Sequence, residues 1–156
     1  MQKITTCLWF DNNAEEAVTF YTSIFKNAKV LEVARYGEAG PGPEGSALTM
    51  RFQLEGVEFM ALNGGPAFKF TEAISLSVDC KSQAEVDELW GRLSEGGSED
   101  QCGWLKDKFG LSWQIVPRAL PEMLGDPDPE KSKRVMEAML KIKKIDIKVL
   151  QEAYEG

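Results

Sequence analysis

The stretch CLWFDNNAEEAVTFYTSIF at residues 7–25 decides the fold, because it passes directly from a strand pattern to a helix pattern. Apolar and β-branched residues predict a strand over residues 3–10. Asn13 followed by Glu16 matches a capping box, and the apolar residues behind it recur at helical spacing. Asn27 is a residue type that ends helices in a left-handed conformation. The chain therefore opens with a strand and an amphipathic helix.

Three more strands are expected after this helix. Alternation of apolar and polar residues predicts them at about 29–36, 46–54 and 57–63. The Gly/Pro-rich segment 37–45 reads as a loop, and Glu55-Gly56 reads as a tight turn. Together these elements complete one βαβββ unit.

The same order of elements then starts again. Thr71 to Asp79 has the pattern of a strand, and Ser82 with Glu85 forms a second capping box in front of a helix that Gly96-Gly97 ends. Phe109-Gly110 marks the last turn of this second unit, and Pro117 closes its last strand. Its three short strands are expected at about 98–101, 102–108 and 111–117.

A helical tail follows. Asp128 before Pro129 is a cap with a first-turn proline, and a second short helix is expected after Asp146. The first of these helices carries an apolar stripe that we expect to cover the sheet or a partner subunit, formed by Val135, Met136, Met139 and Leu140. The predicted fold class is α+β, as a single domain over 1–156 with modules at 1–66 and 67–118 and a tail at 119–156.

Composition limits the partners. The chain of 156 residues has 25 acidic and 18 basic residues, and its formal charge of −7 argues against nucleic acid and anionic membranes. No apolar stretch reaches the roughly 20 residues of a spanning helix, and the N-terminus does not resemble a signal peptide, so we expect a cytoplasmic protein. Cys7, Cys80 and Cys102 form no Cys-x-x-Cys pair and are expected to be small buried apolar residues; a reactive thiol would need a lowered pKa.

Three separated blocks together resemble one known family. Residues 7–25, ALNGGPAFKF at 61–70 and CGWLKDKFGLSWQIVP at 102–117 are similar to the PhnB-like branch of the glyoxalase, bleomycin-resistance and dioxygenase superfamily, whose members are also called vicinal oxygen chelate proteins. The resemblance spans nearly the whole chain. It implies two βαβββ modules whose sheets curl into an open cleft, and a homodimer that can exchange elements between subunits. Family members often carry the label 3-demethylubiquinone-9 3-methyltransferase.

The resemblance also implies where a metal would bind. Metal-using relatives hold a divalent ion with histidine and glutamate side chains from four strands, and the corresponding positions here are Thr6, a position near Ala73, Gln114 and one in strand 57–63. The chain has no histidine, and Glu58 is the only carboxylate of that fourth strand. Because a divalent ion at neutral pH needs imidazole or carboxylate ligands, we expect no metal in this place and no other cofactor.

Alternation in the strands predicts which side chains face the cleft. It turns Ser75 and Ser77 inward, as well as Ser112, Gln114 and Val116, and in the first strand Thr6, Leu8 and Phe10. We expect Gln114 to find its hydrogen-bond partner in Thr6 or Ser75. The candidate ligand-binding residues are Thr6, Leu8, Phe10, Asn63, Phe68, Ser75, Trp104 and Gln114.

Some candidates also fit structural roles. Asn63 lies in a sequence typical of turns, and Trp104 and Phe68 are residue types that often fill a core. Asp107, between two lysines, is the weak candidate for proton transfer, and a solvated strand end is its alternative.

The first functional hypothesis is a metal-free cleft that binds a small molecule. The alternatives are a metal-independent enzyme that uses Asp107 or a cysteine, and a purely structural dimer. A methyltransferase is the least supported, because no Gly-x-Gly-x-Gly loop joins a strand to a helix.

Overall fold

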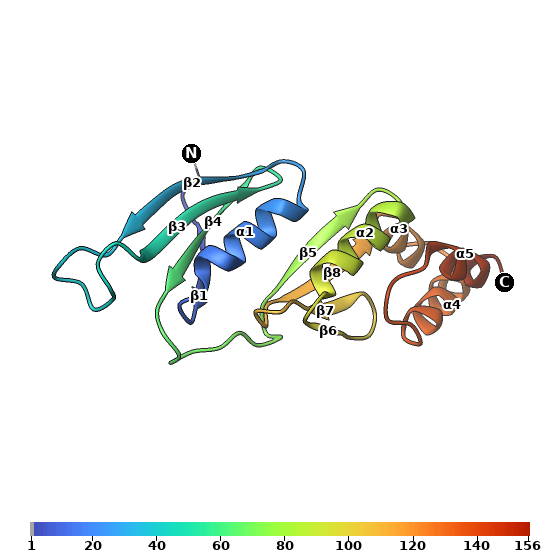
Figure 1. Cartoon of the computed structure of the whole chain (residues 1–156). Helices are drawn as coiled ribbons and strands as arrows, with labels where there is room; N and C mark the ends of the chain where they lie inside the picture. Colours follow the sequence, from blue (N-terminus) through green and yellow to red (C-terminus); the bar gives the residue numbers. More distant parts are fainter. Residues whose placement is uncertain (1) are drawn as a thin grey trace. The chain divides into compact units, whose positions relative to one another are not determined.

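The computed structural model describes residues 2–156. The chain forms two compact units that divide between Phe70 and Thr71. The second unit includes the helical tail. Each unit is a four-stranded sheet with a helix against one face (Figure 1).

The first unit contains one parallel and two antiparallel strand pairs. Its strand order is β1-β4-β3-β2, in which β1 runs parallel to β4. Glu55 and Gly56, with φ values of 48° and 83°, form the predicted tight turn between β3 and β4. The elements are β1 (Thr6–Phe10), α1 (Ala14–Ile24), β2 (Ala28–Arg35), β3 (Ala47–Leu54) and β4 (Val57–Asn63).

The start of α1 differs from the prediction. Asn13 makes no side-chain capping bond, so the predicted capping box does not close. Instead, Asn63 Oδ1 accepts a 2.9 Å hydrogen bond from Ala14 N, and Asn63 Nδ2 donates to Ala47 O at 3.0 Å. The end of α1 also differs, because the helix stops at Phe25 in an extended conformation and not at Asn27. A residue distant in sequence thus supplies the cap that local sequence was expected to supply.

An aromatic stack joins α1 to its sheet. The Tyr21 ring lies 6.4 Å from the Phe52 ring, and the Phe52 ring lies 5.5 Å from the Phe59 ring, measured between centroids. Tyr21 and Phe52 are fully buried. These rings therefore identify which face of the first sheet packs against the helix.

The second unit repeats the order with shorter strands. Its strand order is β5-β8-β7-β6, again with one parallel pair, β5 with β8. The Ser82 side chain accepts a 3.2 Å hydrogen bond from Glu85 N, which confirms the predicted capping of the second helix. The strand expected from Thr71 starts only at Ser75, because residues 71–74 form a turn. The elements are β5 (Ser75–Cys80), α2 (Gln83–Ser94), β6 (Ser98–Glu99), β7 (Trp104–Lys106) and β8 (Ser112–Pro117).

Three helices form the tail: α3 (Ala119–Leu124), α4 (Pro129–Met139) and α5 (Ile147–Glu155). The caps predicted at Asp128 and Asp146 are confirmed, because each carboxylate accepts a backbone N–H bond at 3.0 Å. Helix α3 was not predicted. The tail helices share a buried cluster formed by Leu120, Met123, Val135, Ile145 and Leu150.

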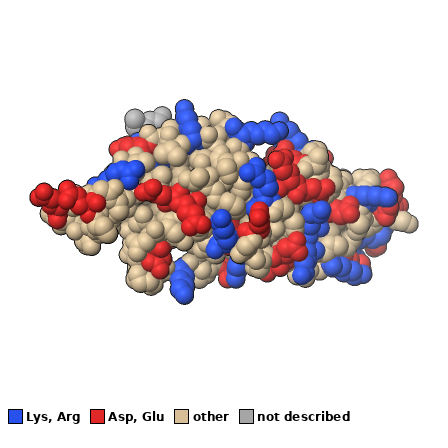
Figure 2. All heavy atoms as spheres, in the orientation of Figure 1, with Lys and Arg blue, Asp and Glu red and all other residues tan. Residues whose placement is uncertain are grey.

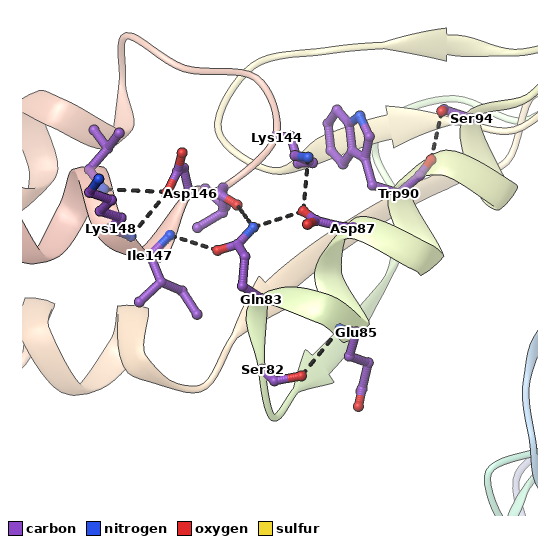
Figure 3. A network of polar contacts seen from close by, with 12 residues as sticks. Ser82, Gln83, Glu85, Asp87, Trp90, Ser94, Lys144, Asp146, Ile147 and Lys148 are labelled. Atoms are coloured by element: carbon purple, nitrogen blue, oxygen red, sulfur yellow. Dashed lines mark hydrogen bonds and ion pairs between the residues drawn. The ribbon is translucent and has the colours of Figure 1, made fainter.

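The tail is tied to α2 by a polar network (Figure 3). Gln83 Nε2 donates to Ile145 O at 3.0 Å, and Gln83 Oε1 accepts from Ile147 N at 2.8 Å. Asp87 on the next turn of α2 pairs with Lys144 at 2.8 Å. The side-chain amide of Gln83 therefore satisfies one backbone acceptor and one backbone donor at the start of α5.

The observed architecture confirms the predicted α+β fold with two βαβββ modules and a C-terminal helical tail. Among residues 2–156, no helix combines the length and apolar character needed to cross a bilayer. Figure 2 shows acidic and basic side chains interspersed over the face that it draws.

Candidate functional site

Each sheet has a face that packs on its helix and an opposite face, here called the distal face. In the first sheet, the helix-packed face carries Phe52, Phe59 and Asn63. Leu8 and Phe10 are register partners of Ala61 and Asn63 on the parallel strand β4, and both are buried. Paired residues point to the same side of a sheet, so Leu8 and Phe10 lie on the helix-packed face.

The predicted orientation of the first strand is therefore wrong. Leu8 and Phe10 belong to the core, where Phe10 also contacts Phe70 with a centroid distance of 5.4 Å. Thr6, two residues before Leu8, shares their face at the exposed end of β1. The physical reason is that burying the large apolar side chains of Leu8 and Phe10 against α1 removes their surface from water, which is favourable.

The distal face of the first sheet instead presents Trp9, which the sequence reasoning missed. Trp9 Nε1 donates to Gly65 O at 2.9 Å, and its ring lies 4.9 Å from the Phe68 ring in an edge-to-face pair. A Cβ atom at Gly64 would come within 2.3 Å of the indole, so only glycine allows this contact. Phe68 itself is 65% exposed. Of the two glycines after β4, Gly64 makes room for the indole ring and Gly65 supplies the carbonyl that the indole N–H bonds.

Glu58 also lies on this distal face, but it is engaged in an ion pair. Arg51 bonds Glu58 at 3.1 Å and Glu32 at 2.9 Å. The hydrogen bond with Glu58, followed by that with Glu32, raises the pKa of Arg51 above its ordinary value. The single carboxylate of β4 is thus already matched by a guanidinium.

Asn63 and Asp107 were proposed as pocket residues and are buried elsewhere. Both polar ends of the Asn63 side chain bond backbone groups at the start of α1 and β3. Asp107 is 2% exposed and accepts hydrogen bonds from Phe109 N (2.8 Å), Leu111 N (3.1 Å) and Trp113 Nε1 (2.9 Å).

The prediction that Asp107 turns inward for proton transfer is therefore not supported by its position. Its three donors are two backbone N–H groups of the turn before β8 and the indole N–H of Trp113, a core residue. Asp107 lies two residues after the fully buried Leu105, so its side chain points to the same helix-packed face of the sheet. This carboxyl group holds the β7–β8 turn.

The distal face of the second sheet carries the polar side chains that the alternation predicted. Ser77, Gln114 and Trp104 are register partners across β5, β8 and β7. Gln114 Nε2 donates to Ser75 Oγ at 3.0 Å, so of the two partners expected for this amide, the structure brings Ser75 to it. Thr6 belongs to the other unit, and its convergence with Gln114 stays a prediction. Ligand binding by these residues is likewise a prediction.

The next row of the same face consists of Ser75, Ser112 and Lys106. Lys106 forms an ion pair with Glu72, and this hydrogen bond lowers the pKa of Glu72 and raises that of Lys106. Ser112 is 1% exposed, and its Oγ has no hydrogen-bond partner among the described residues. The strand alternation predicted Ser75 and Ser112 on this face, but Lys106 was considered only as part of a solvated strand end around Asp107.

The residues do not fit the metal site of the metal-using relatives. Within residues 2–156, no group of three or more histidine, cysteine or acidic side chains is arranged to hold a metal ion. Ala73 lies in the turn before β5, where its N–H bonds the Thr71 hydroxyl at 3.3 Å. Gln114 offers one neutral amide, which already donates to Ser75.

The three cysteines lie in different environments. Burial raises the pKa of Cys80 to about 12, which leaves its thiol protonated at neutral pH. Cys7 is exposed on β1, although partial burial of its thiol raises its pKa. Cys102 is half-buried in a turn with φ of 61°. Neither of the two raised pKa values favours a thiolate nucleophile.

Two βαβββ units, each a four-stranded sheet with a helix against one face, have the architecture of the glyoxalase and bleomycin-resistance class of folds. The solved glyoxylase/bleomycin resistance protein/dioxygenase domain from Frankia sp. EAN1pec is similar, at 16% identity over 75% of this chain and 92% of that chain, with a TM-score of 0.50. The fosfomycin resistance protein FosX from Listeria monocytogenes is also similar, at 16% identity, 78% and 97% coverage and a TM-score of 0.55. At these identities the two likenesses concern the fold alone.

The family follows from closer matches. The family model described as 3-demethylubiquinone-9 3-methyltransferase matches residues 2–116. A PhnB protein from Bacillus cereus is 40% identical, with coverage of 74% of this chain and 99% of that chain and a TM-score of 0.69. This chain belongs to that PhnB-like family. None of the curated proteins matches it.

Proposed function

We propose that this protein binds a small organic molecule on the distal face of its second sheet, without using a metal ion. The observation that carries the proposal is the pair formed by Gln114 and Ser75, with Ser77 and Trp104 on the same face. An amide and two hydroxyls offer hydrogen bonds, and an indole offers a flat apolar surface. Small-molecule sites combine these features. A ligand with a flat apolar body and a carbonyl or hydroxyl group would match them.

The test uses benzamide as a neutral aromatic probe in a nuclear magnetic resonance titration. We expect the indole N–H signal of Trp104 and the side-chain amide signal of Gln114 to shift with one common dissociation constant. Trp90 is the internal reference, because its indole is bonded to Glu99 at 2.7 Å on the helix side. Absence of any shift at both reporter groups would contradict the proposal.

A matched pair of variants separates the site from the rest of the surface. Gln114→Leu should weaken benzamide binding at least fivefold, because a hydrogen bond is worth about 1 kcal/mol. Gln151→Leu changes the same residue type on exposed α5 and should leave the affinity unchanged. Equal losses in both variants would place the probe elsewhere.

A metal-independent enzyme is the second candidate, and a methyltransferase is the third. The enzyme requires a group poised for proton transfer or attack, and the engaged Asp107 and the protonated Cys80 thiol weigh against it. The methyltransferase rests on the description of the family. Calorimetric titration with S-adenosylmethionine tests it, and we expect no saturable heat because the chain lacks the glycine-rich loop of nucleotide-binding folds.

The resemblance to the superfamily also supports a homodimer, with or without exchanged elements, as part of this proposal. Sedimentation velocity at several protein concentrations distinguishes a dimer from the 17.4 kDa monomer. A single monomeric species at all concentrations would remove this part of the proposal.

A further inference from the structure

Three neighbouring strands of the second sheet place two hydroxyls and one ammonium group in a single row. Ser112 on β8 is the register partner of Ser75 on β5 and of Lys106 on β7. All three side chains belong to the distal face, because Trp113 and Leu105, which alternate with them, are buried in the core. Adjacent strands lie about 4.8 Å apart, so the row is short enough for one ligand group to reach more than one member.

The hydroxyl in the middle of this row lacks a partner. Ser112 Oγ is buried and makes no hydrogen bond within the described residues. A buried polar group without a partner typically costs about 1–3 kcal/mol, so such groups call for a structural or functional reason. A hydroxyl can donate to an oxygen atom of a ligand.

Its neighbour Ser75 can donate in the same direction. Ser75 Oγ accepts the hydrogen bond from Gln114 Nε2 at 3.0 Å, so its own proton is not used in that bond. The row thus offers two hydroxyl donors next to a cation.

The cation of the row is held by an exposed carboxylate that can be exchanged. Lys106 pairs with Glu72 in the turn before β5, and the two side chains are 36% and 56% exposed. Exposed ion pairs of this kind contribute about 0–1 kcal/mol, because solvent screens them and ordering the side chains has an entropic cost. The carboxylate of a ligand could therefore replace Glu72 on Lys106 at a small cost in free energy.

We propose that the row Ser75, Ser112 and Lys106 binds an anionic oxygen group of the ligand, and that Glu72 occupies this position in the free protein. On binding, the ligand's anion would replace the Glu72 carboxylate on Lys106 and accept a hydrogen bond from Ser112. Hydrogen bonds to ionised groups are about twice as strong as those between neutral groups. This inference rests on the proposed function, because it assigns the chemical class of the ligand bound on the same face.

Three probes with one aromatic body test the inference: benzamide, benzoate and phenylphosphonate. The first is neutral, and the other two distinguish a planar carboxylate from a tetrahedral anion. We expect at least one of the two anions to bind at least fivefold more tightly than benzamide, as measured by the shift of the Trp104 indole signal. The preferred anion identifies the class of the ligand group.

Three variants give expectations of opposite sign. Glu72→Gln removes the internal competitor and should tighten anion binding about threefold, whereas Ser112→Ala and Lys106→Met should weaken it about tenfold, the loss of one hydrogen bond to a charged group. Glu152→Gln is the matched control, because it neutralises an exposed carboxylate on α5 and should change nothing. The tightening by Glu72→Gln is decisive, since damage to the fold would weaken binding.

The outcomes separate this inference from the proposed function. If benzamide binds and neither anion binds more tightly, the proposed function stands and the anionic class is wrong. If an anion binds but Glu72→Gln leaves its affinity unchanged or lowers it, the exchange with Glu72 is wrong. If no probe shifts Trp104 or Gln114, the proposed function itself fails.

Discussion

The two sheets share one order of elements but differ in how they are completed. In the first sheet, β2 and β3 have eight residues each, whereas β6 and β7 of the second sheet have two and three. The second unit also receives contacts from the tail, through the polar bonds of Gln83 and Asp87 on α2 and through Ile145 beside Gly103. The tail lies beyond residues 2–116, the part that matches the family model. The second unit therefore gains contacts from a helical tail outside the matched residues, whereas the first unit consists of its own strands and helix.

Each unit also contains a buried polar residue whose side chain bonds the backbone of a turn or of a helix start. In the first unit this residue is the amide Asn63, and in the second it is the carboxyl group of Asp107. Asn63 has a donor and an acceptor to satisfy, while Asp107 accepts from three donors. Removal of an acceptor leaves each of its donors without a hydrogen-bond partner. Loss of Asp107 should therefore destabilise the fold more than loss of Asn63.

Asp107→Ala should produce the largest loss of stability. The variant leaves two backbone N–H groups and the Trp113 indole N–H without their acceptor inside the fold. We expect the free energy of unfolding of the second unit to fall by about 3–5 kcal/mol. Urea unfolding followed by tryptophan fluorescence measures this, and hydrogen exchange locates the change.

The matched variant is Asp107→Asn, which keeps one acceptor oxygen for the turn and loses the other. Its expected cost is smaller, about 1–3 kcal/mol. Equal effects of the two variants would mean that the turn bonds contribute little and that the indole bond dominates.

Ile145→Ala tests whether the tail completes the second unit. Ile145 is fully buried and packs against Gly103, where an added Cβ would lie 3.0 Å from its Cγ1. We expect a loss of about 2–4 kcal/mol, typical of a large-to-small change in a core. Increased hydrogen exchange should appear in α2 and β7–β8, while the first unit keeps its protection.

Val149→Ala is the control for this variant. Val149 is 38% exposed on α5, so its truncation should cost less than about 1 kcal/mol. If Ile145→Ala is equally mild, or if it opens only the tail helices, then the tail is an independent appendage and the comparison of the two sheets loses its basis.

The order of the elements could be predicted from sequence because their signals are local. Period-two alternation, the turn at Glu55-Gly56 and the Ser82 cap each depend on residues close together in the chain, and all three are confirmed. The distal positions of Ser75 and Gln114 followed from the same alternation.

The errors arose where distant residues decide. The face of β1 depends on which large side chains α1 buries, and the cap of α1 comes from Asn63 on another strand. The role of Asp107 required knowing that the Trp113 indole lies beside it. Lys106 lies beside Ser112 only because the two residues are register partners on β7 and β8. Tertiary pairing of this kind leaves no periodic signal in one sequence.

The two helix caps provide a finer comparison of the modules. Asn63→Ala removes the acceptor for Ala14 N and the donor to Ala47 O, both buried, and should cost about 2–3 kcal/mol. Ser82→Ala removes one local cap on α2 and should cost about 1 kcal/mol. Thermal unfolding of both variants measures the difference. A larger effect at Ser82 would show that long-range capping does not stabilise the first module more than local capping stabilises the second.

The smallest expected effect concerns pH and the link between α2 and the tail. The hydrogen bond from Lys144, followed by that from Gln83, lowers the pKa of Asp87 below its ordinary value of 3.8. A carboxylate with a lowered pKa in the folded state stabilises above its unfolded pKa, and this contribution is lost as the pH falls through the folded value. Asp87→Asn should therefore destabilise the protein at about pH 6, and this cost should shrink progressively as the pH falls below the ordinary value of 3.8, with a total change under about 1 kcal/mol because the pair is exposed. Lys144→Met should show the same pH dependence if the ion pair is the cause, and a cost of Asp87→Asn that stays constant with pH would contradict a stabilising role for the charge of Asp87.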